Sequence, residues 1–107
     1  KYITVTINEI EIAVIIGNIL DNAIEACLKI IKTDREIWGS LIVDHQNIII
    51  NFKNTAIDSN NLKTSKSNKK DHGYGLKRIS LIAKKYNGYA KFSFLDNTFT
   101  SYVILEN

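Results

Sequence analysis

Residues 17–26, Gly-Asn-Ile-Leu-Asp-Asn-Ala-Ile-Glu-Ala, lie within a run in which apolar residues recur at helical spacing from Ile12 to Ile31. Asn8 precedes the run as a helix cap, and Glu11 follows it three residues later, the spacing of a capping-box partner. We therefore predict that the longest helix of the chain lies here.

The predicted helix has two different faces. At about 100° per residue, Asn18, Asn22 and Glu25 share one face with Glu11 and Lys29, all within about 40° of Asn18. Asparagine has a low helix propensity, and its carboxamide offers an oxygen to a cation and an NH₂ group to a phosphate. This face is either an ordinary solvated surface or a ligand-binding face. The opposite face is predicted to be core: Ile12, Ile16, Ile19, Leu20, Ala23, Cys27, Ile30 and Ile31.

Strand patterns flank this helix and a second one. Residues 2–7 alternate with β-branched side chains, and the runs 37–43 and 47–52 are separated by a short polar turn. Residues 53–72 form a long polar loop, followed by a helix that leads from Gly73-Tyr74-Gly75 to Asn87-Gly88 and by strands over 89–94 and 98–105. The order predicts an α/β (α+β) two-layer sandwich with both helices on one face of a mixed sheet.

Length and composition limit the class of protein. The chain has 107 residues, of which 45% are hydrophobic, which predicts one folded domain over 1–107 and excludes a disordered chain. No apolar run is long enough to cross a bilayer, and the single Cys27 cannot form an internal disulfide. Because the chain starts at Lys1 and contains no Met, we expect it to be a domain excised from a longer protein.

Positive charge is concentrated in one segment. The formal net charge is +3, but residues 63–78 hold six basic residues against Asp71 alone, a local balance of +5. A cationic loop next to Gly73, Gly75 and a helix start is typical of a polyphosphate site, although a Lys-rich surface loop fits the same pattern. The Walker A and dinucleotide-binding fingerprints are both absent, and the two His residues have no zinc-ligand spacing.

Two of these segments together resemble a known superfamily. Residues 17–26 resemble the N box of the gyrase, Hsp90, histidine kinase and MutL (GHKL) superfamily, and His72-Gly73-Tyr74-Gly75-Leu76-Lys77 resembles its second glycine box. The resemblance implies a Bergerat ATP-binding fold with a mobile ATP lid over about residues 55–72. Within the superfamily, the chain looks most like the catalytic ATP-binding domain of sensor histidine kinases that detect peptide pheromones (quorum sensing).

The resemblance also implies roles for individual residues. Asn22 would coordinate a Mg²⁺ that bridges the phosphates of ATP, and Asn18 would lie beside those phosphates. Since ATP hydrolases of the superfamily usually carry Glu at the position of Asn18, a carboxamide there favours phosphoryl transfer over hydrolysis. The other nucleotide-binding positions implied are Glu25, Asn54, Lys66, Gly73, Tyr74, Gly75, Leu76 and Lys77.

The sequence departs from the family pattern at one motif. The first glycine box, Asp-x-Gly-x-Gly, is absent: residues 52–58 contain no Gly, and Asn54 occupies the position of the Asp. A carboxamide oxygen can still accept a hydrogen bond from the adenine N6 amine.

The predicted protein is therefore the cytoplasmic Mg-ATP-binding domain of a membrane-anchored, homodimeric sensor kinase. It would donate the γ-phosphoryl group to a histidine on a dimerisation domain outside this chain, with a response regulator downstream. The alternatives are a serine kinase of the same fold, a degenerate scaffold domain that has lost ATP affinity, and a basic nucleic-acid-binding module.

Overall fold

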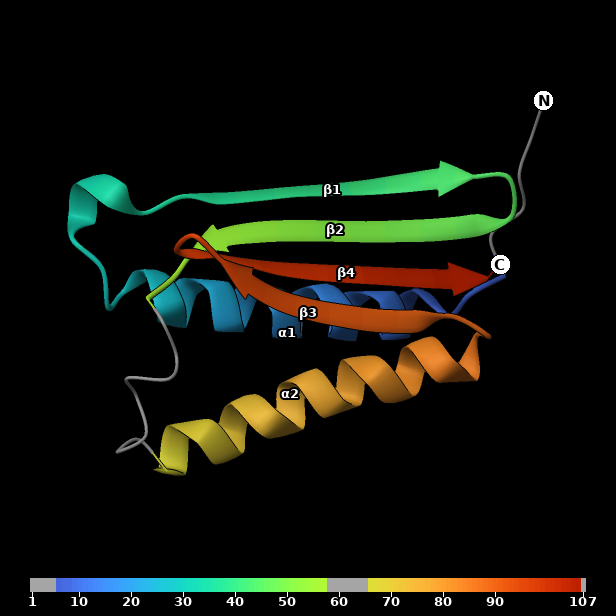
Figure 1. Cartoon of the computed structure of the whole chain (residues 1–107). Helices are drawn as coiled ribbons and strands as arrows, with labels where there is room; N and C mark the ends of the chain where they lie inside the picture. Colours follow the sequence, from blue (N-terminus) through green and yellow to red (C-terminus); the bar gives the residue numbers. More distant parts are fainter. Residues whose placement is uncertain (1–5, 58–65, 107) are drawn as a thin grey trace.

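The computed structural model contains two long helices and four strands (Figure 1). It describes residues 6–57 and 66–106, with only the backbone over 66–74. In chain order the elements are α1 (Glu9–Cys27), a 3₁₀ turn η1 (Lys32–Asp34), β1 (Ile37–Asp44), β2 (Asn47–Thr55), α2 (Lys66–Lys85), β3 (Tyr89–Leu95) and β4 (Thr98–Glu106). The strands form one sheet in the order β1-β2-β4-β3, and both helices lie on the same face of it. The predicted two-layer α+β sandwich is confirmed.

Both predicted hairpins are present. Asp44 pairs with Asn47 across a two-residue turn in which His45 has a φ of 58°. Asp96 and Asn97 form the second turn with φ values of 52° and 59°, the left-handed backbone of the type I′ turns that fit the twist of paired strands. Asn and Asp tolerate this backbone better than other residues with a side chain, so Asp96-Asn97 between two strand patterns predicts the turn.

All pairs between the described strands are antiparallel. The predicted mixed sheet also needs a parallel pair, which the strand predicted over 2–7 would have to form. Residues 2–5 of that prediction lie outside the described residues. Thr6 and Ile7 are described and are not in a strand. Ile7 is instead buried in the core between the helices and the sheet.

Helix α1 begins where predicted and ends earlier. The Asn8 side chain accepts a hydrogen bond from the backbone N–H of Ile10 (2.8 Å). After Cys27 the backbone tightens, because Lys29 N–H bonds to the Ala26 carbonyl and the next residue bonds in the same three-residue pattern. The prediction of a helix to Ile31 is therefore wrong by one turn. With 19 residues, α1 is also one residue shorter than α2.

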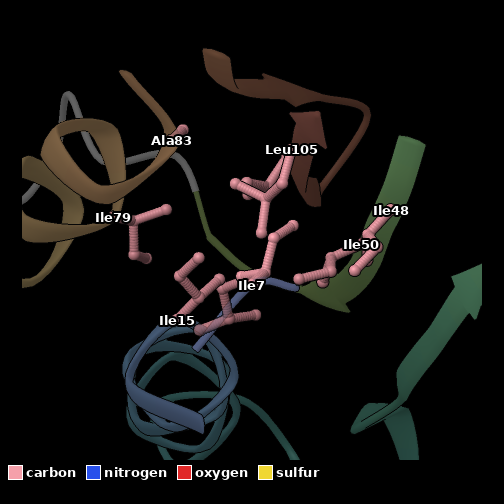
Figure 2. Packing of buried hydrophobic residues seen from close by; sticks show 9 residues of the cluster. Ile7, Ile15, Ile48, Ile50, Ile79, Ala83 and Leu105 are labelled. Carbon is pink, nitrogen blue, oxygen red and sulfur yellow. The ribbon is translucent and has the colours of Figure 1, made fainter. Parts of the chain in front are cut away.

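The core lies between the helices and the central strands (Figure 2). Ile15 is fully buried although it lies outside the predicted core stripe, and Ile31, which belongs to that stripe, is exposed. The buried side of α1 is thus rotated towards Asn18 by part of a turn, because the helix must face α2 as well as the sheet. The core cluster consists of Ile7, Ile15, Ile19, Ile48, Ile50, Ile79, Ala83, Val103 and Leu105.

Helix α2 starts at Lys66, about seven residues before the predicted start at Gly73. Helix propagation explains the difference: once a helix is nucleated by packing of its later turns, each added residue forms one more hydrogen bond. Residues 66–72 of the predicted lid are consequently helical, Thr55 belongs to β2, and 58–65 lie outside the described residues. Neither helix, over the residues described, is apolar over enough length to span a membrane.

Candidate functional site

One face of α1 carries the predicted ligand-binding side chains. Asn18, Asn22 and Glu25 are all half-buried at the side of the helix that turns towards α2. The Asn18 side-chain NH₂ donates to the Val14 carbonyl one turn earlier (2.9 Å), which fixes the carboxamide and leaves its Oδ1 as an acceptor. The Asn22 carboxamide forms no hydrogen bond with any residue in the described ranges, so both of its polar groups remain available to a ligand.

Helix α2 meets this face at Gly75. A Cβ built on Gly75 would lie 3.4 Å from Asn18 Oδ1, so the glycine backbone passes directly beside the carboxamide. The structure therefore brings together the two segments that resemble the N box and the second glycine box, although 57 residues separate Asn18 from Gly75. The prediction that Gly73 and Gly75 stand at a helix start with unpaired amides is wrong, because both lie within α2.

Asn54 lies near the end of β2, on the helix-facing side of the sheet. It has the same orientation as Ile48 and Ile50, since alternate residues of a strand share a face, and its residue is only 5% exposed. Its NH₂ group donates to the Thr55 carbonyl (3.1 Å), whereas its Oδ1 accepts no hydrogen bond from the residues described. The buried side-chain polar atom that lacks a partner among the described residues is Asn51 Oδ1, and Asn54 Oδ1 is an amide oxygen that can accept an N–H from a ligand.

Several bonds fix the strand end that carries Asn54. Thr55 exchanges hydrogen bonds with Glu36 through its backbone N–H and its side-chain hydroxyl, and the Cys27 thiol lies 3.8 Å from the Thr55 carbonyl. The next residue, Ala56, donates its N–H to the carbonyl of Asn97 in the β3–β4 turn. The end of β2 is thus held by the end of α1, by the residue that precedes β1 and by the second hairpin.

A polar cluster joins the start of α1 to the end of α2. The Tyr86 hydroxyl, one residue beyond α2, donates a short hydrogen bond to the Glu11 carboxylate and accepts one from the Asn8 N–H. Lys85 adds an ion pair with Glu11 (3.0 Å). Glu11 therefore bonds to the other helix instead of completing the predicted capping box. Because 75 residues separate Glu11 from Tyr86, no local sequence pattern could reveal this contact.

This cluster shifts the pKa values of both charged groups. The hydrogen bonds from Tyr86 and Lys85 stabilise the carboxylate and lower the pKa of Glu11. The same pairing with Glu11 raises the pKa of Lys85. Both groups are solvent-exposed enough for screening to keep the energetic effect modest.

The remaining predicted positions divide into two groups. Leu76 is half-buried against the core, and Lys77 is exposed on α2 two residues after Gly75, about 200° around the helix from the contact with Asn18. The side chains of Lys66 and Tyr74, and any contact of Gly73, lie outside the described residues. Asn54 lies on the same side of the sheet as Asn18 and Asn22, and no hydrogen bond joins it to either of them among the described residues.

Most of the side-chain atoms that could contact a ligand at this site are uncharged amide groups. Within the described ranges, no three His, Cys, Asp or Glu side chains gather into a metal-binding group. The polar atoms on this side of the described structure are amide oxygens from Asn18, Asn22 and Asn54, with Glu25 as the one half-buried carboxylate on the same face of α1. Such a set fits a polyanion that brings its own metal ion, because neutral oxygens add no repulsion to phosphate charge.

Comparison with known proteins agrees with this geometry. The family model described as a GHKL domain matches residues 7–106, nearly the whole chain. No curated protein matches the chain. The match includes both α1 with its asparagines and α2 with its glycines. The chain therefore belongs to the GHKL family of ATP-binding domains, whose members act as ATPases or kinases.

Proposed function

We propose that this chain is the catalytic ATP-binding domain of a two-component sensor histidine kinase. It binds Mg-ATP and donates the γ-phosphoryl group to a histidine on a dimerisation domain outside residues 1–107. The observation that carries the proposal is the position of the Asn18 carboxamide against Gly75. A phosphate held between α1 and α2 would meet an amide there instead of a carboxylate.

The residue type at position 18 favours transfer over hydrolysis. A carboxamide cannot accept a proton at neutral pH, so Asn18 cannot activate a water molecule as a general base. A neutral histidine is already a nucleophile and attacks the γ-phosphorus without such a base, since phosphoryl transfer depends mainly on positioning and charge stabilisation. The nearest carboxylates on this side of α1 are Asp21, which is exposed, and Glu25, so slow hydrolysis is the competing reaction.

Asn22 is the proposed Mg²⁺ ligand. Its carboxamide has no hydrogen-bond partner among the described residues, and one amide oxygen suffices because Mg²⁺ usually keeps several waters and takes further ligands from substrate phosphates. When bound, the ion would neutralise part of the phosphate charge. Asn54 Oδ1 is proposed to accept the adenine N6 amine. The other proposed contacts to nucleotide come from Glu25, Lys66, Gly73, Tyr74, Leu76 and Lys77.

Helix α2 must change if the Gly75 amide is to bind a phosphate. Inside a helix this N–H is directed at the carbonyl four residues earlier and cannot reach a ligand. We propose that ATP binding unwinds the first turns of α2 as far as Gly75. Two glycines within three residues make this part of the helix weak, since each costs about 1 kcal/mol relative to Ala.

The proposal extends to the intact protein. Residues 1–107 would be the cytoplasmic part of a membrane-anchored homodimer of the pheromone-sensing type, with a response regulator as the downstream acceptor. The family match supports the ATP-binding part of this description, and the kinase subtype rests on the resemblance of the two boxes.

Calorimetric titration of the chain with ATP, with and without Mg²⁺, tests the nucleotide site. We expect saturable, Mg²⁺-dependent binding that Asn22→Ala abolishes. Asn47→Ala is the matched control, because Asn47 is also half-buried but lies at the far end of β2, on the other face of the sheet. Absence of binding at millimolar ATP would contradict the proposal and favour a scaffold domain.

Phosphotransfer needs a separate test. The chain is mixed with γ-³²P-ATP and the dimerisation domain of its own kinase, and acid-labile phosphohistidine is measured on that domain. We expect transfer that depends on Asn22. Free phosphate released faster than phosphohistidine forms would identify an ATPase instead. Nucleic-acid binding that is steeply salt-dependent and indifferent to Asn22→Ala would point to the basic binding module.

A further inference from the structure

The Asn54 carboxamide has a donor end and an acceptor end, and the structure fixes which end the protein itself uses. Its Nδ2 donates to the Thr55 carbonyl at 3.1 Å, and the residue is buried. If the amide turned over, Oδ1 would meet that carbonyl oxygen, and two acceptors cannot bond to each other. The Thr55 carbonyl therefore determines the orientation of Asn54 and leaves the acceptor end for a ligand.

The peptide unit that carries the Thr55 carbonyl is held by two other elements. It also contains the Ala56 N–H, and a planar trans peptide keeps the two groups rigidly opposed. The Ala56 N–H donates to the Asn97 carbonyl in the β3–β4 turn at 3.0 Å. The Cys27 thiol, at the end of α1, lies 3.8 Å from the Thr55 carbonyl oxygen. Rotation of this peptide plane would break both contacts, so the carbonyl stays in the position that orients Asn54.

The Thr55 hydroxyl anchors the same residue to the segment that precedes β1. Its Oγ1 accepts from the Glu36 N–H at 3.1 Å and donates to the Glu36 carbonyl at 3.5 Å, and the Thr55 N–H bonds to that carbonyl at 3.0 Å. Because neighbouring residues of a strand alternate between its faces, the Thr55 side chain lies on the opposite face of the sheet from Asn54. Thr55 therefore acts on the Asn54 amide through the backbone, from the face that the helices do not cover.

We propose that Thr55, supported by Cys27, is a positioning residue that makes the site select adenine over a purine with a carbonyl at position 6. The inference rests on the proposed function, in which Asn54 Oδ1 accepts the N6 amine of ATP. Adenine presents an N–H donor at position 6, whereas hypoxanthine presents a carbonyl oxygen there. A fixed Oδ1 bonds to the first and repels the second, but a carboxamide that could turn over would accept both.

The need for a positioning residue arises from the residue type at position 54. The Asp of the family pattern, when ionised, has acceptor oxygens at both ends, so turning its side chain over changes nothing that a base can detect. A carboxamide has one acceptor and one donor end, and its selectivity depends on which of them faces the ligand. With Asn54 in this chain, selection of the base therefore depends on Thr55 as well.

Titration with ATP and with inosine triphosphate (ITP) tests the proposal, because the two nucleotides differ only at position 6 and in the proton on N1. Calorimetry of the full chain with Mg-ATP and Mg-ITP gives two Kd values and their ratio. We expect the unsubstituted chain to bind ATP at least about tenfold more tightly than ITP. Thr55→Val removes the hydroxyl and keeps the shape of the side chain. It should reduce this preference at least about threefold, mainly by tightening the binding of ITP.

Conservative variants separate positioning from general damage. Thr55→Ser keeps the hydroxyl and should restore the preference for ATP. Cys27→Ala should reduce the preference in the same direction as Thr55→Val, and Cys27→Ser should retain it because serine is also a donor. Thr100→Val is the matched control and should leave the ratio unchanged, because Thr100 is half-buried on the same face of the sheet but pairs with Lys53.

The outcomes distinguish this inference from the proposed function. Circular dichroism verifies that all variants fold. If Thr55→Val weakens ATP and ITP by the same factor, the positioning role is overturned while the ATP site stands. Equal binding of ATP and ITP by the unsubstituted chain also overturns it, because the Asn54 amide would then not be fixed. If the unsubstituted chain binds neither nucleotide, the proposed function is refuted and this inference with it.

Discussion

Among the described glycines, Gly88 is the position at which an added methyl group should lower the free energy of unfolding most. A Cβ at this position would lie 1.7 Å from the Ile104 carbonyl oxygen and 2.7 Å from its carbon, both in the backbone of β4. Because real Cβ contacts are almost never below 3.0 Å, the two backbones would have to separate by at least 1.3 Å. No rotamer change can relieve this clash. The separation would disturb β4 beside buried Val103 and Leu105.

The size of the expected destabilisation follows from the two backbone hydrogen bonds that this separation would strain. The Gly88 N–H bonds to the Ala83 carbonyl at 2.8 Å, and the Glu106 N–H bonds to the Tyr86 carbonyl at 2.9 Å, so the same shift strains both connections. We expect Gly88→Ala to lower the free energy of unfolding by more than about 4 kcal/mol. That is comparable with the whole stability of a small domain, about 5–15 kcal/mol.

Gly17→Ala is the matched substitution with the opposite sign. Gly17 is exposed in the interior of α1 with open space around it. Alanine there gains about 1 kcal/mol of helix propensity, which corresponds to a rise in Tm of about 4–8 °C. Thermal unfolding followed by circular dichroism measures both variants. A Gly88→Ala protein that melts within a few degrees of the unsubstituted chain, or a lowered Tm for Gly17→Ala, would refute the reasoning.

Three further substitutions test the site and the core. Gly75→Ala should raise Tm, since its Cβ would make only a 3.4 Å contact, but weaken ATP binding in calorimetry by stabilising the helix that must unwind. Ile15→Ala should cost about 2–5 kcal/mol in urea unfolding, against less than about 0.5 kcal/mol for Ile24→Ala, because only Ile15 is buried. Tyr86→Phe removes the largest cause of the lowered pKa of Glu11. The lowered pKa contributes stability above the ordinary Glu pKa, which is lost as pH falls through the lowered value. The deficit of Tyr86→Phe in urea midpoint should therefore be larger at pH 7 than at about pH 3, and an equal deficit at both would contradict this role.

Local patterns predicted the hairpins and failed at the helix boundaries. The turns at His45 and Asp96-Asn97 can be predicted from the sequence because their backbone conformation depends on the residues in the turn itself. The start of α2 cannot be predicted in this way, because Gly73 and Gly75 indicate a helix boundary in the sequence whereas cooperative helix formation extends past them to Lys66. Ile15 was missed since the wheel of one helix contains no information about where a second helix packs.

The site followed the same division between local and long-range information. The amide face of α1 was visible as asparagines at helical spacing, and its partner was visible as a glycine box. What no spacing could predict was their contact between Asn18 and Gly75, or the anchoring of both helices by Tyr86 and Glu11. These contacts depend on how α1 and α2 cross, which is set by the sheet beneath them.

The order of the strands has a consequence for biosynthesis. The last strand of the described structure, β4, is not at an edge but lies between β2 and β3, and it carries the buried residues Val103 and Leu105. While a ribosome is still adding residues 98–106, the β1–β2 hairpin and β3 have no strand to join them. The sheet can close only after residues 98–106 have left the exit tunnel, so this domain completes its folding after translation of β4. Loss of β4 would separate β3 from the other described strands.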